Sequence, residues 1–223
     1  MPIPRHDDRC HLLSRPFMYV PAHFEETRTD ELHRLIREYP LGILVTDHGG
    51  LLDANHLPFE LELSTERPLL RAHVARNNPV WQESDGEEVL VIFRGQHAYV
   101  SPNWYPSKHE AHRQVPTWNY QVVHVRGRLK VMDEERFVRG VVGRLTRTHE
   151  ASEAKPWKMS DSTPEFISGM LANIVGIEVE ISEIVGKSKL SQNKEERDRL
   201  GAAERLEQLG SSELSAAMQR AME

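Results

Sequence analysis

The stretch best suited to holding an anion is His73-Val74-Ala75-Arg76-Asn77-Asn78-Pro79, where a predicted strand runs into a predicted helix. The first turn of a helix exposes free backbone N–H groups and carries a partial positive charge, and both suit a phosphate group. Arg76 adds a charge-assisted donor, and Asn77 and Asn78 add neutral amide donors. A capped helix with a surface arginine would give the same pattern, so the residues alone leave both interpretations open.

Aromatic side chains gather in a second stretch that could face a planar ring. Trp104, Tyr105, Trp118 and Tyr120 lie close together, although the whole chain has only four Trp and five Tyr. Prolines fix this stretch, and amide side chains are interleaved with the rings. Such a wall can bind a flat ligand or form an interface between chains. The alternative is ordinary packing at the rim of a barrel.

A third stretch combines Lys187, Lys189 and Lys194 with small polar donors, directly after a predicted strand. These lysines could bind an anion or a DNA phosphate. Acidic residues follow at once, from Glu195 onward. A solvated helix start with internal salt bridges therefore fits this stretch equally well.

Other chemical motifs are incomplete. Gly186-Lys187-Ser188 resembles the end of a P-loop, but Ile181 stands where the first glycine is required. The stretch His109-Glu110-Ala111-His112 lacks the spacing of a zinc-binding helix, and a single cysteine, Cys10, cannot complete a zinc set. No Gly-x-Ser-x-Gly nucleophile motif is present. We therefore predict no metal site and identify no catalytic residue.

The composition indicates a cytoplasmic globular protein without a membrane span. The net charge of −6 and the pI of about 6.1 give no global sign of nucleic-acid or membrane-surface binding. One cysteine allows no intrachain disulfide, which is typical of a reducing compartment. The N-terminus lacks the apolar run of a signal peptide, and no apolar stretch approaches the roughly 20 residues of a membrane span.

The pattern along the chain predicts a mainly β fold with flanking helices. Apolar runs and alternating residues predict strands at 41–47, 51–63, 69–75, 89–94, 97–101, 117–132 and 174–185. Amphipathic spacing predicts helices at 30–39, after 77–79, and at 134–149, 164–173, 194–208 and 211–222. Strands in hairpin succession favour an antiparallel barrel over a doubly wound sheet. We expect an N-terminal arm at 1–16, a barrel domain at 17–193 and a helical extension at 194–223.

Several of these stretches, in this order, resemble the PaiB-type FMN-binding negative transcriptional regulators. The resemblance rests on Met18-Tyr19-Val20-Pro21, Asn55-His56-Leu57-Pro58-Phe59, residues 73–81, 101–108 and 115–120, Ile174-Val175-Gly176-Ile177-Glu178, and Lys189-Leu190-Ser191-Gln192-Asn193. The sequence departs from the family pattern in the extension before Met18. It also has Ser188 where the family leads us to expect an aromatic residue.

The family is similar to the pyridoxamine-phosphate-oxidase and flavin-reductase split barrels. The resemblance therefore implies a six-stranded antiparallel barrel, a homodimer, and FMN in the groove between the subunits. By position it places His56, Leu57 and Pro58 along the isoalloxazine, and His73, Arg76, Asn77 and Asn78 at the phosphate. It also implies a ring pocket shaped by Ser101, Trp104, Tyr105, Trp118 and Asn119, some of them from the partner, and closed by Lys189, Ser191 and Gln192.

The resemblance implies a flavin-dependent negative regulator of transcription. The sequence gives direct DNA binding little support, because the chain is acidic and no clear helix-turn-helix is present. Regulation through a partner protein, or through removal of a metabolite, is an equally good interpretation. The alternatives are an FMN-dependent oxidoreductase of the flavin-reductase or pyridoxamine-phosphate-oxidase kind, and a haem-binding split barrel.

Overall fold

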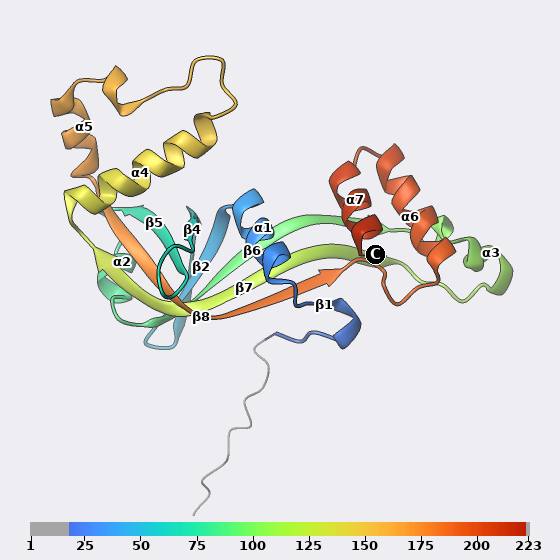
Figure 1. Ribbon diagram of the computed structural model, residues 1–223. Helices are drawn as coiled ribbons and strands as arrows, with labels where there is room; N and C mark the ends of the chain where they lie inside the picture. Colours follow the sequence, from blue (N-terminus) through green and yellow to red (C-terminus); the bar gives the residue numbers. More distant parts are fainter. Residues whose placement is uncertain (1–17, 222–223) are drawn as a thin grey trace, which may run out of the picture.

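One antiparallel sheet organises the chain in this computed structural model, which describes residues 18–221. Its strands follow the order β3-β2-β6-β7-β8-β5-β4, with β1 paired to β8. The strands are β1 (Glu25–Glu26), β2 (Leu41–His48), β3 (Leu51–Pro58), β4 (Glu60–Glu62), β5 (Leu69–Ala75), β6 (Glu88–Val100), β7 (Thr117–Met132) and β8 (Ile174–Lys189). The sheet curls so that β3 and β5 come into contact, which gives a barrel (Figure 1).

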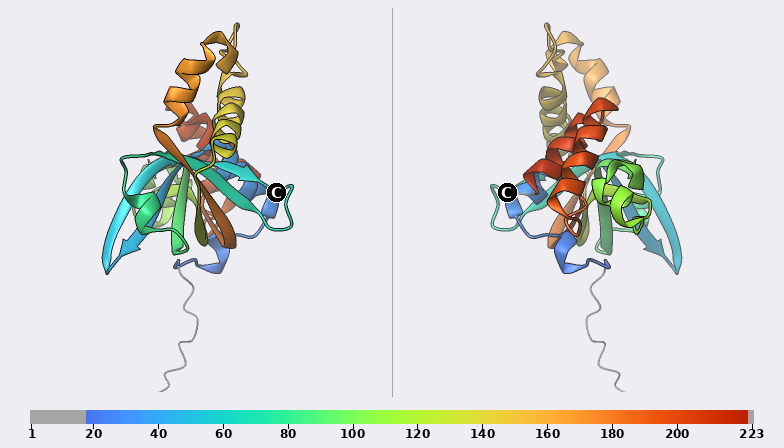
Figure 2. Two further views of the ribbon diagram at one scale, coloured as in Figure 1. Left: turned by 90° about the vertical axis from the view of Figure 1, so that its left-hand side faces the viewer. Right: turned by 90° about the vertical axis from the view of Figure 1, so that its right-hand side faces the viewer.

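Helices flank this sheet (Figures 1 and 2). They are α1 (Thr29–Glu38), α2 (Val80–Glu83), α3 (Pro106–Ala111), α4 (Glu135–Glu150), α5 (Pro164–Leu171), α6 (Glu196–Gln208) and α7 (Ser212–Arg220), with short 3-10 turns at Ala22–Phe24, Pro102–Trp104 and Met159–Asp161. The α4–α5 hairpin stands off one end of the barrel, and α3, α6 and α7 lie at the other end of the molecule.

The core lies inside the barrel, where the strands place alternate residues. On β7, Val123, Val125 and Leu129 are fully buried, whereas His124, Arg126 and Arg128 point to the other face. From β6, Val91 and Phe93 join the same core. Antiparallel pairing with period-two alternation therefore accounts for this part of the fold.

Strands β6, β7 and β8 continue past the barrel and carry a second apolar cluster. There Leu190 packs with Leu206 of α6 and with Leu214 and Met218 of α7, and the ring of Tyr105 is buried among them. The C-terminal helices thus cover the inner face of the long sheet where the barrel no longer does (Figure 1).

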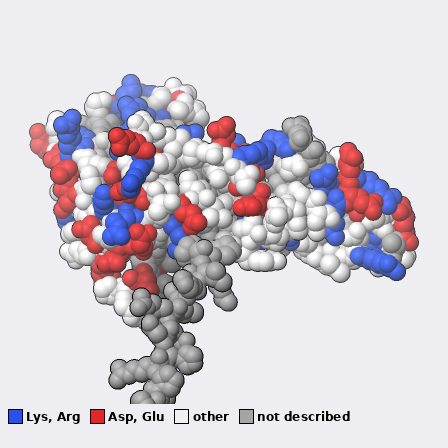
Figure 3. All heavy atoms as spheres, turned by 60° about the horizontal axis from the view of Figure 1, so that its bottom comes forward, with Lys and Arg blue, Asp and Glu red and all other residues white. Residues whose placement is uncertain are grey.

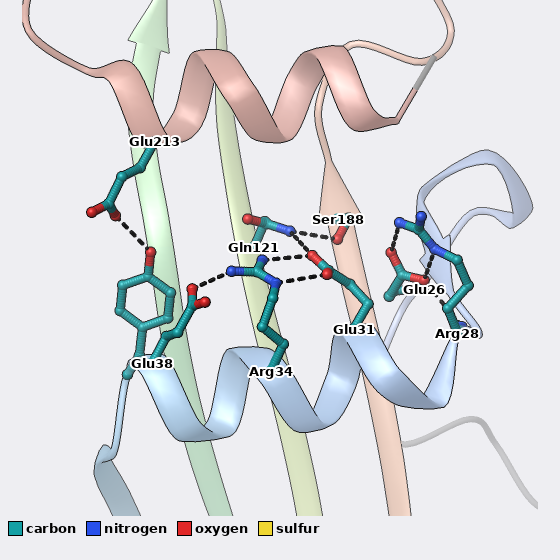
Figure 4. Close-up of polar contacts among 9 residues, drawn as sticks. Glu26, Arg28, Glu31, Arg34, Glu38, Gln121, Ser188 and Glu213 are labelled. Atoms are coloured by element: carbon teal, nitrogen blue, oxygen red, sulfur yellow. Dashed lines mark hydrogen bonds and ion pairs between the residues drawn. The ribbon is translucent and has the colours of Figure 1, made fainter. Parts of the chain in front are cut away.

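Helix α1 lies between the barrel and α7, and polar contacts tie it to both (Figure 4). Its Glu31 accepts two hydrogen bonds of 2.7 Å from Arg34, which lower the pKa of that carboxyl. The amide of Gln121 on β7 donates to Glu31 at 3.3 Å and to Ser188 at 3.1 Å. Ser188, at the position where an aromatic residue was expected, is therefore buried within a polar network.

The predicted mainly β fold with flanking helices is confirmed, with differences at three places. The predicted turn at 95–96 is wrong, because β6 runs on through it with an irregularity between Arg94 and His97. Strand β8 continues beyond Val185 to Lys189, because these residues still pair with β7. The expected loop at 102–116 contains a 3-10 turn and α3.

The predicted arm at 1–16 lies outside the described residues, and the division into domains at 193 stays a prediction. Within residues 18–221, no helix is long and apolar enough to cross a membrane.

A buried carboxylate holds α3 against α6, and its removal should destabilise the C-terminal end. Asp198 accepts hydrogen bonds from the backbone N–H of Ser107 at 3.0 Å, from its hydroxyl at 2.6 Å and from Gln114 at 3.2 Å. The Asp198→Ala change leaves the backbone N–H and the hydroxyl of Ser107 without an acceptor, so we expect the free energy of unfolding to fall by about 2–4 kcal/mol. Urea unfolding measures this loss. The exposed Glu196→Ala variant is the control, and equal stability of both variants would contradict the prediction.

Candidate functional site

The first part of the predicted site lies where β3 meets the junction between β5 and α2. The amide of Asn78 donates to the side-chain oxygen of Asn55 at 2.7 Å, so the junction is joined directly to β3. The Oδ1 atom of Asn78 accepts from the backbone N–H of Val80, the first residue of α2, at 3.0 Å. The side chains of His56 and Asn77 are exposed beside this contact. The contact between Asn55 and Asn78 thus joins β3, the strand that holds the predicted residues His56, Leu57 and Pro58, to the junction that holds the two asparagines.

Arg76 is held by its own chain. Its guanidinium donates to the carboxylate of Asp133 at 2.6 and 2.9 Å, to the carbonyl of Ala172 at 2.7 Å and to that of Ile174 at 3.1 Å. The hydrogen bonds to Asp133 raise the pKa of Arg76 and lower the pKa of Asp133. A phosphate at Arg76 would therefore have to displace Asp133, a partner that sequence reasoning did not identify.

Helix α2 has only four residues, Val80–Glu83. A helix this short has a small dipole. The predicted phosphate contact at this junction therefore depends on individual N–H and amide donors more than on the helix dipole.

His73 lies apart from the asparagines. It pairs in register with Gly176 of β8 and faces a pocket under α4 and α5. Burial lowers the pKa of its imidazole. An apolar pocket without a cation does not suit a phosphate dianion, which sets His73 apart from the other predicted phosphate ligands.

The second part of the predicted site lies at the distal end of the sheet, and much of it is buried. The amide of Asn119 donates to the hydroxyl of Ser191 at 3.0 Å and to the sulfur of Met218 at 3.4 Å. The hydroxyl of Tyr105 lies 3.4 Å from the same Ser191 oxygen. These three predicted residues form a network beneath α6 and α7, and their side chains do not reach the open face of the sheet.

The remaining distal residues have local partners. Ser101 caps the following 3-10 turn by accepting from the N–H of Asn103 at 3.2 Å. Trp104 packs against the C-terminal apolar cluster. Gln192 accepts from the N–H of Leu190 at 2.7 Å and donates to the carbonyl of Ser188 at 2.6 Å.

Trp118 is different, because it stays on the open face with 48% of its surface exposed. Its ring stacks on His97 with centroids 5.8 Å apart and planes 20° apart. Its carbonyl accepts from the ammonium of Lys189 at 2.9 Å. Burial lowers the pKa of Lys189, and the nearby Lys187 and Lys194 lower it further. Aromatic surface and positive charge therefore meet at this point.

A hollow of about 380 Å³ lies on the outer face of β2, β6 and β7. It is lined by Ile43, Ile92, Arg94, His97, Trp118, Tyr120 and Val122. Ile43 pairs in register with His56 of β3 on one side and with Ile92 on the other. The hollow thus lies between His56 and Trp118.

Figure 3 shows the underside of the molecule, where charged side chains gather over the two ends and are sparser between them.

Sequence reasoning did not select Ile43, Ile92 or Val122 as site residues. The available signal was that outward-facing positions of these strands are apolar, whereas strands with a solvated face usually carry polar residues there.

The predicted site is divided within one chain. Its β3 and β5 residues belong to the barrel, whereas Trp104, Tyr105 and Ser191 lie under the C-terminal helices at the other end of the long strands (Figure 1). One chain therefore does not bring all the predicted residues around a single ligand.

Comparison with known proteins gives matches over most of the chain. The family described as "Putative FMN-binding domain" matches residues 18–183. A relative in Bacillus subtilis, "Protease synthase and sporulation protein PAI 2", is 31% identical over 191 residues, which cover 85% of this chain and 89% of that protein.

Two solved structures are similar in fold. The flavocytochrome Anf3 from Azotobacter vinelandii has a TM-score of 0.57 at 10% identity and covers 82% of this chain and 79% of its own. The FAD and heme binding protein from Mycobacterium smegmatis has a TM-score of 0.55 at 16% identity and covers 80% and 79%. The expected split-barrel fold is confirmed by these neighbours.

The pair between Arg76 and Asp133 should give the stability an acid-sensitive component. Because Arg76 lowers the pKa of Asp133, the stabilisation is complete above the ordinary value of 3.8 and is lost as the pH falls through the folded value. We therefore expect Asp133→Asn to be less stable than the wild type at pH 7, and the difference to shrink by pH 3. Urea unfolding at both pH values measures it, with Glu134→Gln as the control. A difference that is the same at both pH values would contradict this account.

Proposed function

Because the chain belongs to the family of FMN-binding domains and FMN is its cofactor, we propose that two copies join to hold one FMN in each of two intersubunit sites. The observation that carries the proposal is the hollowed, largely apolar outer face between His56 and Trp118. It offers a surface for a planar ring and for a second copy at once.

The residues of the barrel fit FMN. An isoalloxazine needs a flat apolar surface, which Ile43 and Ile92 provide beside His56. The phosphate needs donors, and the side-chain amide of Asn77 would supply one, whereas the backbone N–H groups of Arg76, Asn78 and Val80 already have partners. The side-chain amide of Asn77 has no hydrogen-bond partner among the described residues, so binding a phosphate would break no existing hydrogen bond there. When bound, FMN supplies a ring that takes up and releases electrons.

A homodimer explains why the outer face is apolar. Trp118 is 48% and Tyr99 is 47% exposed, and half-exposed aliphatic residues adjoin them. A contiguous apolar patch on a chain usually marks an interaction surface. In a two-fold dimer the same face meets itself, so the distal end of one chain can approach the barrel of the other.

This arrangement would reunite the divided site. The partner subunit's Trp118 and the partner's Lys189 would approach the ring from the far side. Tyr105, Asn119 and Ser191 would support that wall from behind rather than touch the ring, because they are buried within their own chain. Arg76 would contact the phosphate only by exchanging Asp133 for it.

A regulatory role through FMN or a protein partner is the biological part of the proposal. The name of the Bacillus subtilis relative, "Protease synthase and sporulation protein PAI 2", connects that protein with sporulation, which supports a regulatory role. The C-terminal helices do not favour direct DNA contact, because Arg197 is paired with Glu110 and Glu195 and the chain carries a net charge of −6. A mobility-shift assay at physiological salt should show no specific DNA binding. Bleaching of the bound FMN by NADH or NADPH without oxygen would instead favour the oxidoreductase interpretation.

The Asn77→Ala variant tests the phosphate contact. Loss of a hydrogen bond to a charged group costs about 1.5–3 kcal/mol, so we expect the Kd for FMN to rise by roughly 10- to 100-fold. Quenching of flavin fluorescence measures the affinity. Stability should not change, because Asn77 is exposed, and the exposed amide change Gln208→Ala on α6 serves as the control. An unchanged FMN affinity would place the phosphate elsewhere.

The Ile92→Glu variant tests the dimer. A carboxylate at the centre of the outer face would place a charge in the apolar interface, so we expect a monomer with weakened FMN binding. Sedimentation analysis gives the mass, and circular dichroism checks that the variant is folded. The matched change Leu200→Glu, at a residue of α6 that is 46% exposed, should stay dimeric. A monomeric wild-type protein, or a dimeric Ile92→Glu variant, would refute the interface.

A further inference from the structure

A polar pocket of about 300 Å³ lies between α1 and α7, and Figure 4 shows most of the side chains around it. It is lined by Arg34 and Glu38 of α1, by Tyr39 and Gln121, and by Glu213 and Arg220 of α7. Tyr120 and Val122, the neighbours of Gln121 on β7, line the outer hollow instead. Because successive residues of a strand point to opposite faces, the pocket and the proposed flavin site lie on opposite faces of β7.

The amide of Gln121 reaches this pocket from the sheet, although the residue is only 2% exposed. Its nitrogen donates to Glu31 at 3.3 Å and to Ser188 at 3.1 Å, which fixes the way the amide faces. Its oxygen points away from Ser188, on the side of Glu213 (Figure 4). This oxygen has no hydrogen-bond partner among the described residues and is not closed off from the pocket. Polar atoms of buried residues usually have a partner, so a ligand that donates a hydrogen bond fits here.

Two carboxylates line the same pocket, and each has one oxygen free among the described residues. Oε2 of Glu213 accepts from the hydroxyl of Tyr39 at 2.9 Å and from the amide of Gln96. Oε2 of Glu38 accepts from Arg34. Burial raises the pKa of Tyr39, and the charges of Glu213 and Glu38 raise it further, so both carboxylates lie near its hydroxyl. Together with the oxygen of Gln121, the two Oε1 atoms offer three acceptors, which suit the three N–H donors of an ammonium group.

A free guanidinium stands at the end of α7. Arg220 makes no hydrogen bond or ion pair with any described residue, whereas Arg34 is already bonded to Glu31 and Glu38. The hydrogen bonds from Arg34 lower the pKa of Glu31 most, and the charge of Arg220 lowers it further. Arg220 therefore lies within electrostatic reach of α1 across the pocket. A free guanidinium in this position suits a carboxylate, which it can bind through two hydrogen bonds.

Ligands with a single charge fit this pocket poorly. A simple anion would meet three acceptor oxygens, two of which belong to carboxylates, and a simple amine would lie beside Arg220 without a partner for that charge. A zwitterion meets both requirements at once.

We propose that this pocket binds a small α-amino acid. Its ammonium group donates to Gln121, Glu38 and Glu213, and its carboxylate accepts from Arg220. A cavity of about 150 Å³ can hold benzene, so one of about 300 Å³ has room for an amino acid. Besides the ring of Tyr39, only Ala216 among the lining residues is apolar, which favours a short side chain. This inference does not depend on the proposed FMN site.

Three compounds with one carbon skeleton test the two charges separately. L-alanine carries both charges, L-alaninamide lacks the carboxylate, and N-acetyl-L-alanine lacks the ammonium group. Calorimetric titration at about pH 6, where the amines are protonated and the carboxylates ionised, should show saturable binding of L-alanine. Both analogues should bind more weakly by roughly tenfold or more, because each loses charge-assisted hydrogen bonds. No saturable binding of L-alanine, or an analogue that binds equally well, would overturn the proposal.

The Arg220→Gln variant assigns the carboxylate contact. It should bind L-alanine roughly tenfold or more weakly and should no longer prefer L-alanine to L-alaninamide. A purely structural effect would weaken both compounds alike and keep the preference. The exposed change Arg205→Gln on α6 is the matched control and should bind as the wild type does. An unchanged preference in Arg220→Gln would overturn the proposal.

The Glu213→Gln variant assigns the ammonium contact. It should weaken L-alanine and L-alaninamide alike, whereas Glu204→Gln, an exposed change on α6, should weaken neither. Equal binding of L-alanine to wild type and Glu213→Gln would overturn the assignment of the ammonium group.

Two further titrations separate this pocket from the proposed flavin site. Saturating FMN should not displace L-alanine, because the two sites lie on opposite faces of β7. Folded Ile92→Glu protein should bind L-alanine as the wild type does, because the pocket is formed within one chain. Displacement by FMN, or loss of L-alanine binding in folded Ile92→Glu protein, would overturn the proposal, whereas a failure of FMN to bind would leave it standing.

Discussion

The long antiparallel ladder of β6, β7 and β8 is the constraint on which the rest of the structure depends. Its strands carry apolar residues on both faces, as Val91 and Val123 point inward while Ile92 and Val122 point outward. Both faces must then be removed from water to gain the hydrophobic stabilisation. The barrel core, α1 and the C-terminal helices cover the inner face. Among residues 18–221 no element covers the hollow on the outer face, so a flavin and a second copy are its proposed partners.

The length of these strands also decides how the candidate site is divided. Strands β6, β7 and β8 extend beyond the barrel, so their distal part needs an apolar core of its own. Helices α6 and α7 provide this core around Tyr105 and Leu190. Asn119 and Ser191, which lie in the family motifs, are buried there and form a hydrogen bond with each other. These two residues therefore lie behind the proposed ring site, whereas Trp118 and Lys189 remain near the open face of the sheet.

At the barrel end of the molecule, the junction between β5 and α2 contacts both β3 and the end of α5. Asn78 joins the β5–α2 junction to β3, on the side of the proposed flavin. Arg76 turns the other way and ties the same junction to the end of α5. One short segment therefore positions both the proposed phosphate donor, Asn77, and the frame of the apolar pocket under α4 and α5.

The sequence by itself determined the mainly β class, the bounds of β7 and the approximate bounds of most helices, because period-two and helical spacing are local properties. The family motifs determined that the chain binds FMN. Only the tertiary structure decided that Arg76 pairs with Asp133 and that His73 faces α4 and α5, because those partners are distant in sequence. It also decided which face of the sheet stays open. When both sets of alternating residues are apolar, as on β6, the alternation cannot say which face the helices cover.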